Sequence, residues 1–169
     1  MSKVRGLVLG SVTNKLLAKL DFTPLLVVGK GTKARKFLLC LDGSAGAMRA
    51  VDYTGSILNS SDYEVNLTHV IRAEEKEGIA EAEIKIGAVF DYAKTRLIDS
   101  GIKIDQINTQ IITGAKSRAG AIVEEAKQCG YGTIVIGRRG ISNVPDFSMG
   151  RVSDKVIHLA GGHTVWVVP

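Results

Sequence analysis

The sequence predicts an α/β protein built around an open parallel β-sheet with helices on both faces. Short apolar or alternating segments, typical of strands, take turns along the chain with longer segments of helical periodicity. Strands that alternate with helices form βαβ units, whose crossover helices cover both faces of a parallel sheet. The 169 residues, 45% of them hydrophobic and 23% charged, suffice for one such domain and a fragment of another.

Five segments have the composition and the alternation of strands. They are residues 37–41, 64–71, 104–112, 133–136 and 164–168. Helical periodicity predicts four helices between them, at residues 46–59, 75–99, 117–129 and 151–160. The last three helices are each followed by a glycine, as expected where a helix ends in a left-handed residue. These are Gly101, Gly130 and Gly161.

An internal repeat relates the two ends of the chain. Residues 10–28 match residues 150–168 at an offset of 140 without a gap, and each copy contains a glycine, an apolar helical stripe and a strand. The identical pairs are Gly10/Gly150, Val12/Val152, Lys15/Lys155, Val27/Val167 and Val28/Val168. We therefore expect residues 1–29 to be the last helix and strand of a first unit, residues 30–36 a linker, and residues 37–169 a complete second unit.

A glycine pattern after the segment 133–136 is the motif with chemical content. Gly137, Gly140 and Gly150 are spaced as Gly-x2-Gly-x9-Gly, and Gly150 opens the last helix. Glycines let backbone approach an anion closely and adopt positive φ, and the N–H groups of Gly150 to Ser153 at the helix start attract the same anion. We expect a phosphate to bind there.

A carboxylate follows the first strand of the complete unit. That strand ends in Leu41-Asp42, which places Asp42 across the switch point of the sheet from the glycines. There it would contact a ribose or a phosphate-bound metal, or else cap the following helix.

Together these residues resemble the ATP-binding members of the universal stress protein family over residues 36–169, with the family's C-terminal signature again over residues 6–28. The resemblance implies strand order 3-2-1-4-5 within the complete unit, an adenine nucleotide α-hydrolase-like architecture, and ATP as ligand with or without Mg²⁺. It also implies that the backbone of Val70 brackets the adenine. The implied nucleotide-binding residues are Leu41, Asp42, Val70, Ile136, Gly137, Arg139, Gly140, Gly150, Arg151, Val152 and Ser153.

Arg151 is a departure from the family pattern, which has a small hydroxyl residue after the third glycine. A guanidinium there would either contact phosphate or fill the space that phosphates need. The N-terminal copy has the hydroxyl at Ser11 but lacks the first strand and the first two glycines, so it cannot form a complete site.

Three functions follow from this interpretation. The first is an ATP-binding regulatory module in a stress response, without catalytic residues; the second is a nucleotide-free dimerisation or assembly module, which Arg151 favours; the third is a weak ATP hydrolase. The three histidines have no metal-ligand spacing, and the basic stretch 30–36 has no interleaved aromatic residues typical of nucleic-acid binding. No apolar run is long enough for a membrane helix, and we expect a cytoplasmic protein.

The N-terminal strand needs a partner, because an unpaired apolar strand is prone to aggregation. Members of the family commonly dimerise by antiparallel pairing of their fifth strands. The resemblance therefore implies that residues 25–28 pair with residues 164–168, either within one chain as a pseudo-dimer or between two chains as a homodimer.

Overall fold

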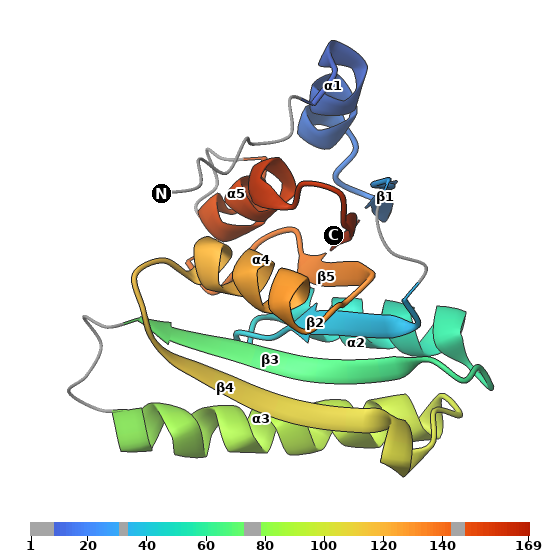
Figure 1. The fold of residues 1–169 in the computed structure, drawn as a ribbon. Coiled ribbons are helices and arrows are strands. Elements are labelled where there is room, and N and C mark those ends of the chain that lie inside the picture. The colour runs from blue at the N-terminus through green and yellow to red at the C-terminus, as the bar shows by residue number, and fades with distance from the viewer. Residues whose placement is uncertain (1–8, 31–33, 73–78, 143–147) are drawn as a thin grey trace.

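A six-stranded sheet between two layers of helices forms the molecule (Figure 1). The computed structural model describes residues 9–30, 34–72, 79–142 and 148–169. The strands are β1 (Leu25–Val27), β2 (Lys36–Cys40), β3 (Glu64–Arg72), β4 (Ile107–Ala115), β5 (Thr133–Gly137) and β6 (Thr164–Val168). The helices are α1 (Ser11–Lys19), α2 (Ala45–Leu58), α3 (Ile79–Asp99), the short 3₁₀ helix η2 (Ile104–Gln106), α4 (Arg118–Gln128) and α5 (Arg151–Leu159).

The strand order confirms the predicted topology. The strands lie in the order β1-β6-β5-β2-β3-β4, and all neighbours except β1 and β6 are parallel. Strands β2 to β6 therefore have the expected order 3-2-1-4-5 when they are numbered within the complete unit. The N-terminal strand adds a sixth member to this sheet.

Two hydrophobic cores lie on opposite faces of the sheet. Alternation along β2 sends Leu39 toward α2 and α3, and Leu38 toward α4 and α5, and both side chains are fully buried. Trp166 belongs to the first core and meets the ring of Phe37 edge-on at 5.1 Å between centroids. Helix α1 contributes Leu17 to the second core.

The N-terminal strand pairs within the chain. Strand β1 runs antiparallel to β6, with Leu25 opposite Val167, Leu26 opposite Trp166 and Val27 opposite Val165. Subtracting the repeat offset of 140 from the partners gives 27, 26 and 25, so the pairing is symmetric about Leu26 and Trp166. The two copies of the repeat are thus related by a local two-fold axis, as the fifth-strand pairing predicted.

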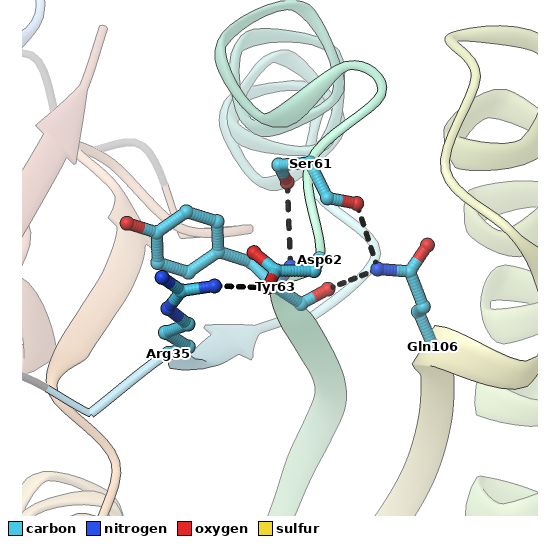
Figure 2. Close-up of polar contacts among 5 residues, drawn as sticks. All are labelled: Arg35, Ser61, Asp62, Tyr63 and Gln106. Carbon is cyan, nitrogen blue, oxygen red and sulfur yellow. Dashed lines mark hydrogen bonds and ion pairs between the residues drawn. The ribbon is translucent and has the colours of Figure 1, made fainter.

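Strand β4 begins three residues later than the predicted strand at 104–112. The apolar Ile104 belongs instead to η2, where the Gln106 side chain accepts a hydrogen bond from the Lys103 N–H at 3.0 Å. The Gln106 amide also donates to the carbonyls of Ser61 and Tyr63 (Figure 2). Periodicity alone does not reveal this turn, because the side-chain amide that stabilises it pairs with a distant loop.

The contacts in Figure 2 hold together the N-terminal ends of three strands, at the end of the sheet opposite the glycine motif. Arg35, just before β2, pairs with Asp62 and lies over the Tyr63 ring, with its guanidinium carbon 5.9 Å from the ring centroid. These contacts join the starts of β2, β3 and β4. The part of the predicted helix at residues 75–78 lies outside the described residues.

Candidate functional site

A cavity of about 760 Å³ lies where β2, β3 and β5 end, beside the first turns of α4 and α5. This is the switch point of the sheet, because the connection from β2 leads to one side and that from β5 to the other. Every site residue named from the sequence lines it: Leu41, Asp42, Val70, Ile136, Gly137, Arg139, Gly140, Gly150, Arg151, Val152 and Ser153.

Asp42 joins the two loops that frame the cavity. One carboxylate oxygen accepts the Ser44 N–H at 3.0 Å, and the other accepts the Ile141 N–H of the glycine loop at 3.3 Å. The cap of α2 is Ser44 instead, whose hydroxyl accepts the Ala47 N–H at 3.1 Å. Asp42 therefore positions the glycine loop, and the capping role left open for it belongs to its neighbour.

The glycines of the motif are required for space and not for positive φ. Among the described residues, the glycines with positive φ do not include Gly137, Gly140 or Gly150, so that expectation is wrong. A Cβ on Gly137 would lie 2.7 Å from the carbonyl carbon of Gly46. A Cβ on Gly140 would lie 2.6 Å from a carboxylate oxygen of Asp42. Gly137 thus lets β5 pack against the first turn of α2, while Gly140 leaves room for the carboxylate that holds the loop.

The start of helix α5 offers backbone donors to the cavity. Gly150 is its N-cap and provides no side-chain hydrogen bond. The Gly150 N–H itself donates to the Arg138 carbonyl at 2.9 Å, so the expectation that it faces a phosphate is wrong. The N–H groups of the next three residues have no acceptor within the helix, because the carbonyls four residues before them lie outside it. They are therefore available to an anion.

Arg151 and Ser153 have different roles in that turn. Ser153 is buried, and its hydroxyl donates to the Gly137 carbonyl at 2.7 Å, which ties the start of α5 to the end of β5. The Arg151 side chain is exposed at the rim of the cavity.

Positive charge dominates the cavity lining. The basic lining residues are Arg72, Arg118, Arg139, Arg151 and Lys155. Among the described residues, Asp42 is the one carboxylate of the lining. A cluster of cations beside uncapped backbone N–H groups attracts polyanions such as phosphates.

Arg118 was not among the site residues predicted from the sequence. It is the first residue of α4, and its Nε donates to the Val70 carbonyl at 3.3 Å, beside the expected adenine position. The preceding Ser117 caps the helix by accepting the Gly120 N–H. A helix that starts directly after a parallel strand begins at the ligand-binding edge, and this signal could have identified Arg118.

Arg138 was not predicted either, and its side chain points away from the cavity into the protein. It is 2% exposed, and its guanidinium donates to the carbonyls of Ser148, Leu20 and Leu17. Burial lowers the pKa of Arg138, and the negative charge of Asp21 acts in the opposite direction. The ordinary arginine pKa is so high that the group remains charged. This residue of the glycine loop therefore caps the C-terminal end of α1.

A thiol, that of Cys40 at the end of β2, lies beside the cavity. Burial, followed by the charge of Asp42, raises the pKa of the Cys40 thiol, which keeps it protonated.

In the part of the chain that the structure describes, no three His, Cys, Asp or Glu side chains gather at a metal-binding geometry. Each histidine ring contacts a backbone carbonyl, His69 that of Leu41 at 2.7 Å. None of the described helices is long and apolar enough to cross a membrane.

The fold and the cavity define a parallel-sheet α/β protein with an anion-binding loop at its switch point. The sequence profile of the universal stress protein family matches residues 33–169. The chain belongs to this family. Universal stress protein YxiE of Bacillus subtilis (strain 168) is 26% identical over 141 residues, which are 74% of this chain and 93% of that protein.

Solved structures share the fold. The protein MJ0577 is 26% identical, with a TM-score of 0.66 over 81% of this chain and 96% of its own. A universal stress protein solved in complex with cAMP has a TM-score of 0.62 at 22% identity, covering 81% of this chain and 98% of its own. A universal stress protein from Archaeoglobus fulgidus DSM 4304 has a TM-score of 0.69 at 22% identity, over 99% of this chain but 58% of its own. The last match includes the N-terminal helix and strand.

Proposed function

We propose that the protein is an ATP-binding regulatory module, in which nucleotide occupancy changes the surface offered to partners in a stress response. The observation that carries the proposal is the start of α5, whose backbone donors have no side-chain cap and open into a cavity lined by five cations. Family membership supplies the stress role, and the related protein in complex with cAMP supports an adenine nucleotide as ligand.

We assign the parts of the nucleotide by the chemistry of the lining. The triphosphate would meet the N–H groups of Arg151 to Ser153 and the loop around Gly140, with Arg139 and Arg151 at hand to neutralise its charge. The ribose or a phosphate-bound Mg²⁺ would meet Asp42, and the adenine would lie against Leu41, Val70 and Ile136. The five cations of the lining fit the phosphates of ATP, and a Mg²⁺ held by those phosphates would have the Asp42 carboxylate as its one described acidic neighbour.

Calorimetric titration of the purified protein with ATP, with and without Mg²⁺, tests this function. Adenosine is the matched control, since it has the same base and ribose without phosphates. We expect ATP to bind more tightly than adenosine, by a factor of about 10 or more for one charge-assisted contact. Absence of ATP binding in both titrations, together with no nucleotide released on denaturation and detected by mass spectrometry, would reject the function.

Two other functions keep specific support. An assembly module without ligand is favoured by Arg151 at the position of the family's hydroxyl residue. A weak ATP hydrolase shares the architecture, and a steady-state phosphate-release assay separates it from the binding module. The cytoplasmic location remains a prediction.

A further inference from the structure

A buried hydroxyl without a partner lines the cavity. Thr68 of β3 is 1% exposed, and its hydroxyl has no hydrogen-bond partner among the residues that the structure describes. Thr68 is nevertheless one of the residues that line the cavity. A buried hydroxyl without a partner costs free energy, because it has lost its hydrogen bonds to water and gained none in return. In a binding cavity, such a group indicates a ligand atom that would complete its hydrogen bonding.

Alternation along β3 turns the Thr68 side chain toward the cavity. Leu67 belongs to the first core, which α2 and α3 cover, whereas Val70 belongs to the second core, which α4 and α5 cover. Thr68 comes two residues before Val70 and therefore lies on the same face of the sheet. Ala119 and Ile122 of α4 belong to the second core and also line the cavity. The Thr68 side chain thus lies on the face of the sheet that forms the cavity.

Thr68 also lies at the inner end of the cavity. Of the β3 residues that line it, Thr68 is the furthest from the C-terminal end of the strand. Its partner on β2 is Cys40, the last residue of that strand. Asp42 and the start of α5, in contrast, lie beyond the ends of β2 and β5. The cavity therefore extends from these loops back to a hydroxyl within the sheet.

We propose that the Thr68 hydroxyl recognises the base of the nucleotide, by accepting a hydrogen bond from the 6-amino group of adenine. This assignment rests on the proposed function, which puts the ribose beside Asp42 and the phosphates at the start of α5. The 6-amino group is on the side of the purine remote from the ribose, so it is the part of the base that reaches furthest into the cavity. A hydroxyl has two lone pairs that can accept the amino proton there.

The apolar lining makes this hydrogen bond selective. The members of the second core that line the cavity offer hydrocarbon, a thioether and a weakly hydrogen-bonding thiol. They are Cys40, Val70, Ala119, Ile122, Ile136 and Met149. An amino group buried among them without a partner would lose its hydration uncompensated. The Thr68 hydroxyl and the amino group satisfy each other, whereas a purine with hydrogen at that position leaves the hydroxyl unpaired.

Calorimetric titration with two nucleotides tests the contact. The probes are ATP and purine riboside 5′-triphosphate, which differs from ATP in having hydrogen in place of the 6-amino group. We expect the unmodified protein to bind ATP about 3- to 10-fold more tightly than the analogue, as one neutral hydrogen bond provides. In Thr68→Val, which keeps the shape of the side chain, this preference should disappear, because ATP weakens while the affinity for the analogue is unchanged.

Three control measurements show whether the change comes from the hydroxyl. Thr68→Ser keeps the hydroxyl and should keep the preference for ATP. Thr54→Val should also keep it, because the hydroxyl of this fully buried threonine donates to the Ala50 carbonyl at 2.7 Å and does not line the cavity. The Tm of nucleotide-free Thr68→Val should not fall, since the substitution removes a buried hydroxyl that has no partner.

The outcomes separate this assignment from the proposed function. A preference for ATP that persists in Thr68→Val, an equal loss of both nucleotides, or equal affinities in the unmodified protein would overturn the assignment, while ATP binding itself would be retained. A marked fall in the Tm of nucleotide-free Thr68→Val would also overturn it, because the hydroxyl would then have a partner within the protein. Absence of binding by either nucleotide to any of these proteins would reject the function and the assignment together.

Discussion

At the scale of single residues, the site is held together by close packing of backbone around one carboxylate. Asp42 accepts hydrogen bonds from both framing loops, and Gly140 leaves the space in which one of its oxygens lies. Ser153 and the Gly150 N–H are engaged by the backbone of residues 137 and 138. The donors that we propose for phosphate binding are therefore the few N–H groups that these contacts leave unused.

Gly140→Val should abolish ATP binding and keep the fold. The new Cβ would collide with the Asp42 carboxylate, which can move only by giving up its contact to the Ile141 N–H and entering the cavity. Calorimetry measures the loss, and circular dichroism checks the fold. Gly87→Val is the matched control, because nothing lies within 4 Å of a Cβ there. Unchanged ATP affinity in Gly140→Val would show that the loop does not bind phosphate.

Arg151→Ala and Arg151→Ser distinguish contact from obstruction. If the guanidinium contacts phosphate, Arg151→Ala weakens ATP by about 1.5–3 kcal/mol and leaves adenosine unchanged. We expect this result, because the Arg151 side chain is exposed at the rim. Tighter ATP binding by Arg151→Ser would instead identify the arginine as the obstruction that favours an assembly module. Titration of the three proteins under the same salt decides between them.

The Cys40 thiol should make the protein less stable in alkali. Because burial raises its pKa, the folded state keeps a proton that the unfolded state loses near pH 8.5, so this contribution is present below that pH and is lost as the pH rises. Between pH 7 and 9.5 we expect the free energy of unfolding to fall by about 1 kcal/mol more in Cys129→Ala, which retains Cys40, than in Cys40→Ala. Urea unfolding at both pH values measures the difference. Equal losses would show that Cys40 titrates normally.

At the scale of elements, the buried guanidinium of Arg138 connects the glycine loop to α1. Arg138→Met would remove the donors to the carbonyls of Leu17, Leu20 and Ser148 and leave them buried. We expect a loss of about 1–3 kcal/mol in the free energy of unfolding and faster amide exchange in α1.

Arg139→Met is the matched control for this change. Arg139 is the neighbouring residue and lines the cavity, where it should affect nucleotide binding and not α1. If amide exchange in α1 became equally faster in both variants, or in neither, Arg138 would not be the connection between the loop and the helix.

The elements also show how far the sequence alone could be interpreted. The parallel sheet was predictable because apolar strands alternate with helices, and the family resemblance implied the strand order that brings the glycine loop and Asp42 to one crevice. Arg118 could have been identified from the start of α4, but Arg138 could not, since its bonds to the carbonyls of Leu17 and Leu20 join segments distant in the chain. Likewise, the space around Gly137 depends on the first turn of α2, which no local pattern specifies.

At the scale of the whole molecule, an N-terminal helix and strand, α1 and β1, join the sheet formed by the other five strands. The symmetric pairing of β1 with β6 reproduces across one chain the strand contact that the family resemblance implies between subunits. The domain boundaries expected from the sequence, with a first unit ending at residue 29 and a linker at residues 30–36, remain a proposal. This proposal predicts that α1 and β1 stabilise the unit on which they pack.

Deleting residues 1–29 tests whether α1 and β1 stabilise the rest of the chain. The truncated chain would expose the edge of β6 and the core residues that Leu17 covers, and would leave the guanidinium of Arg138 without the carbonyls of α1. An open apolar strand such as β6, with Val165 and Val167 on one face, promotes edge-to-edge association. We expect a lower Tm and self-association in light scattering that increases with concentration. The full-length chain carrying Leu26→Lys is the control, since it adds charge to β1 without uncovering β6. A truncated chain that stayed monomeric and equally stable would show that the N-terminal element is dispensable for the unit and does not protect its edge.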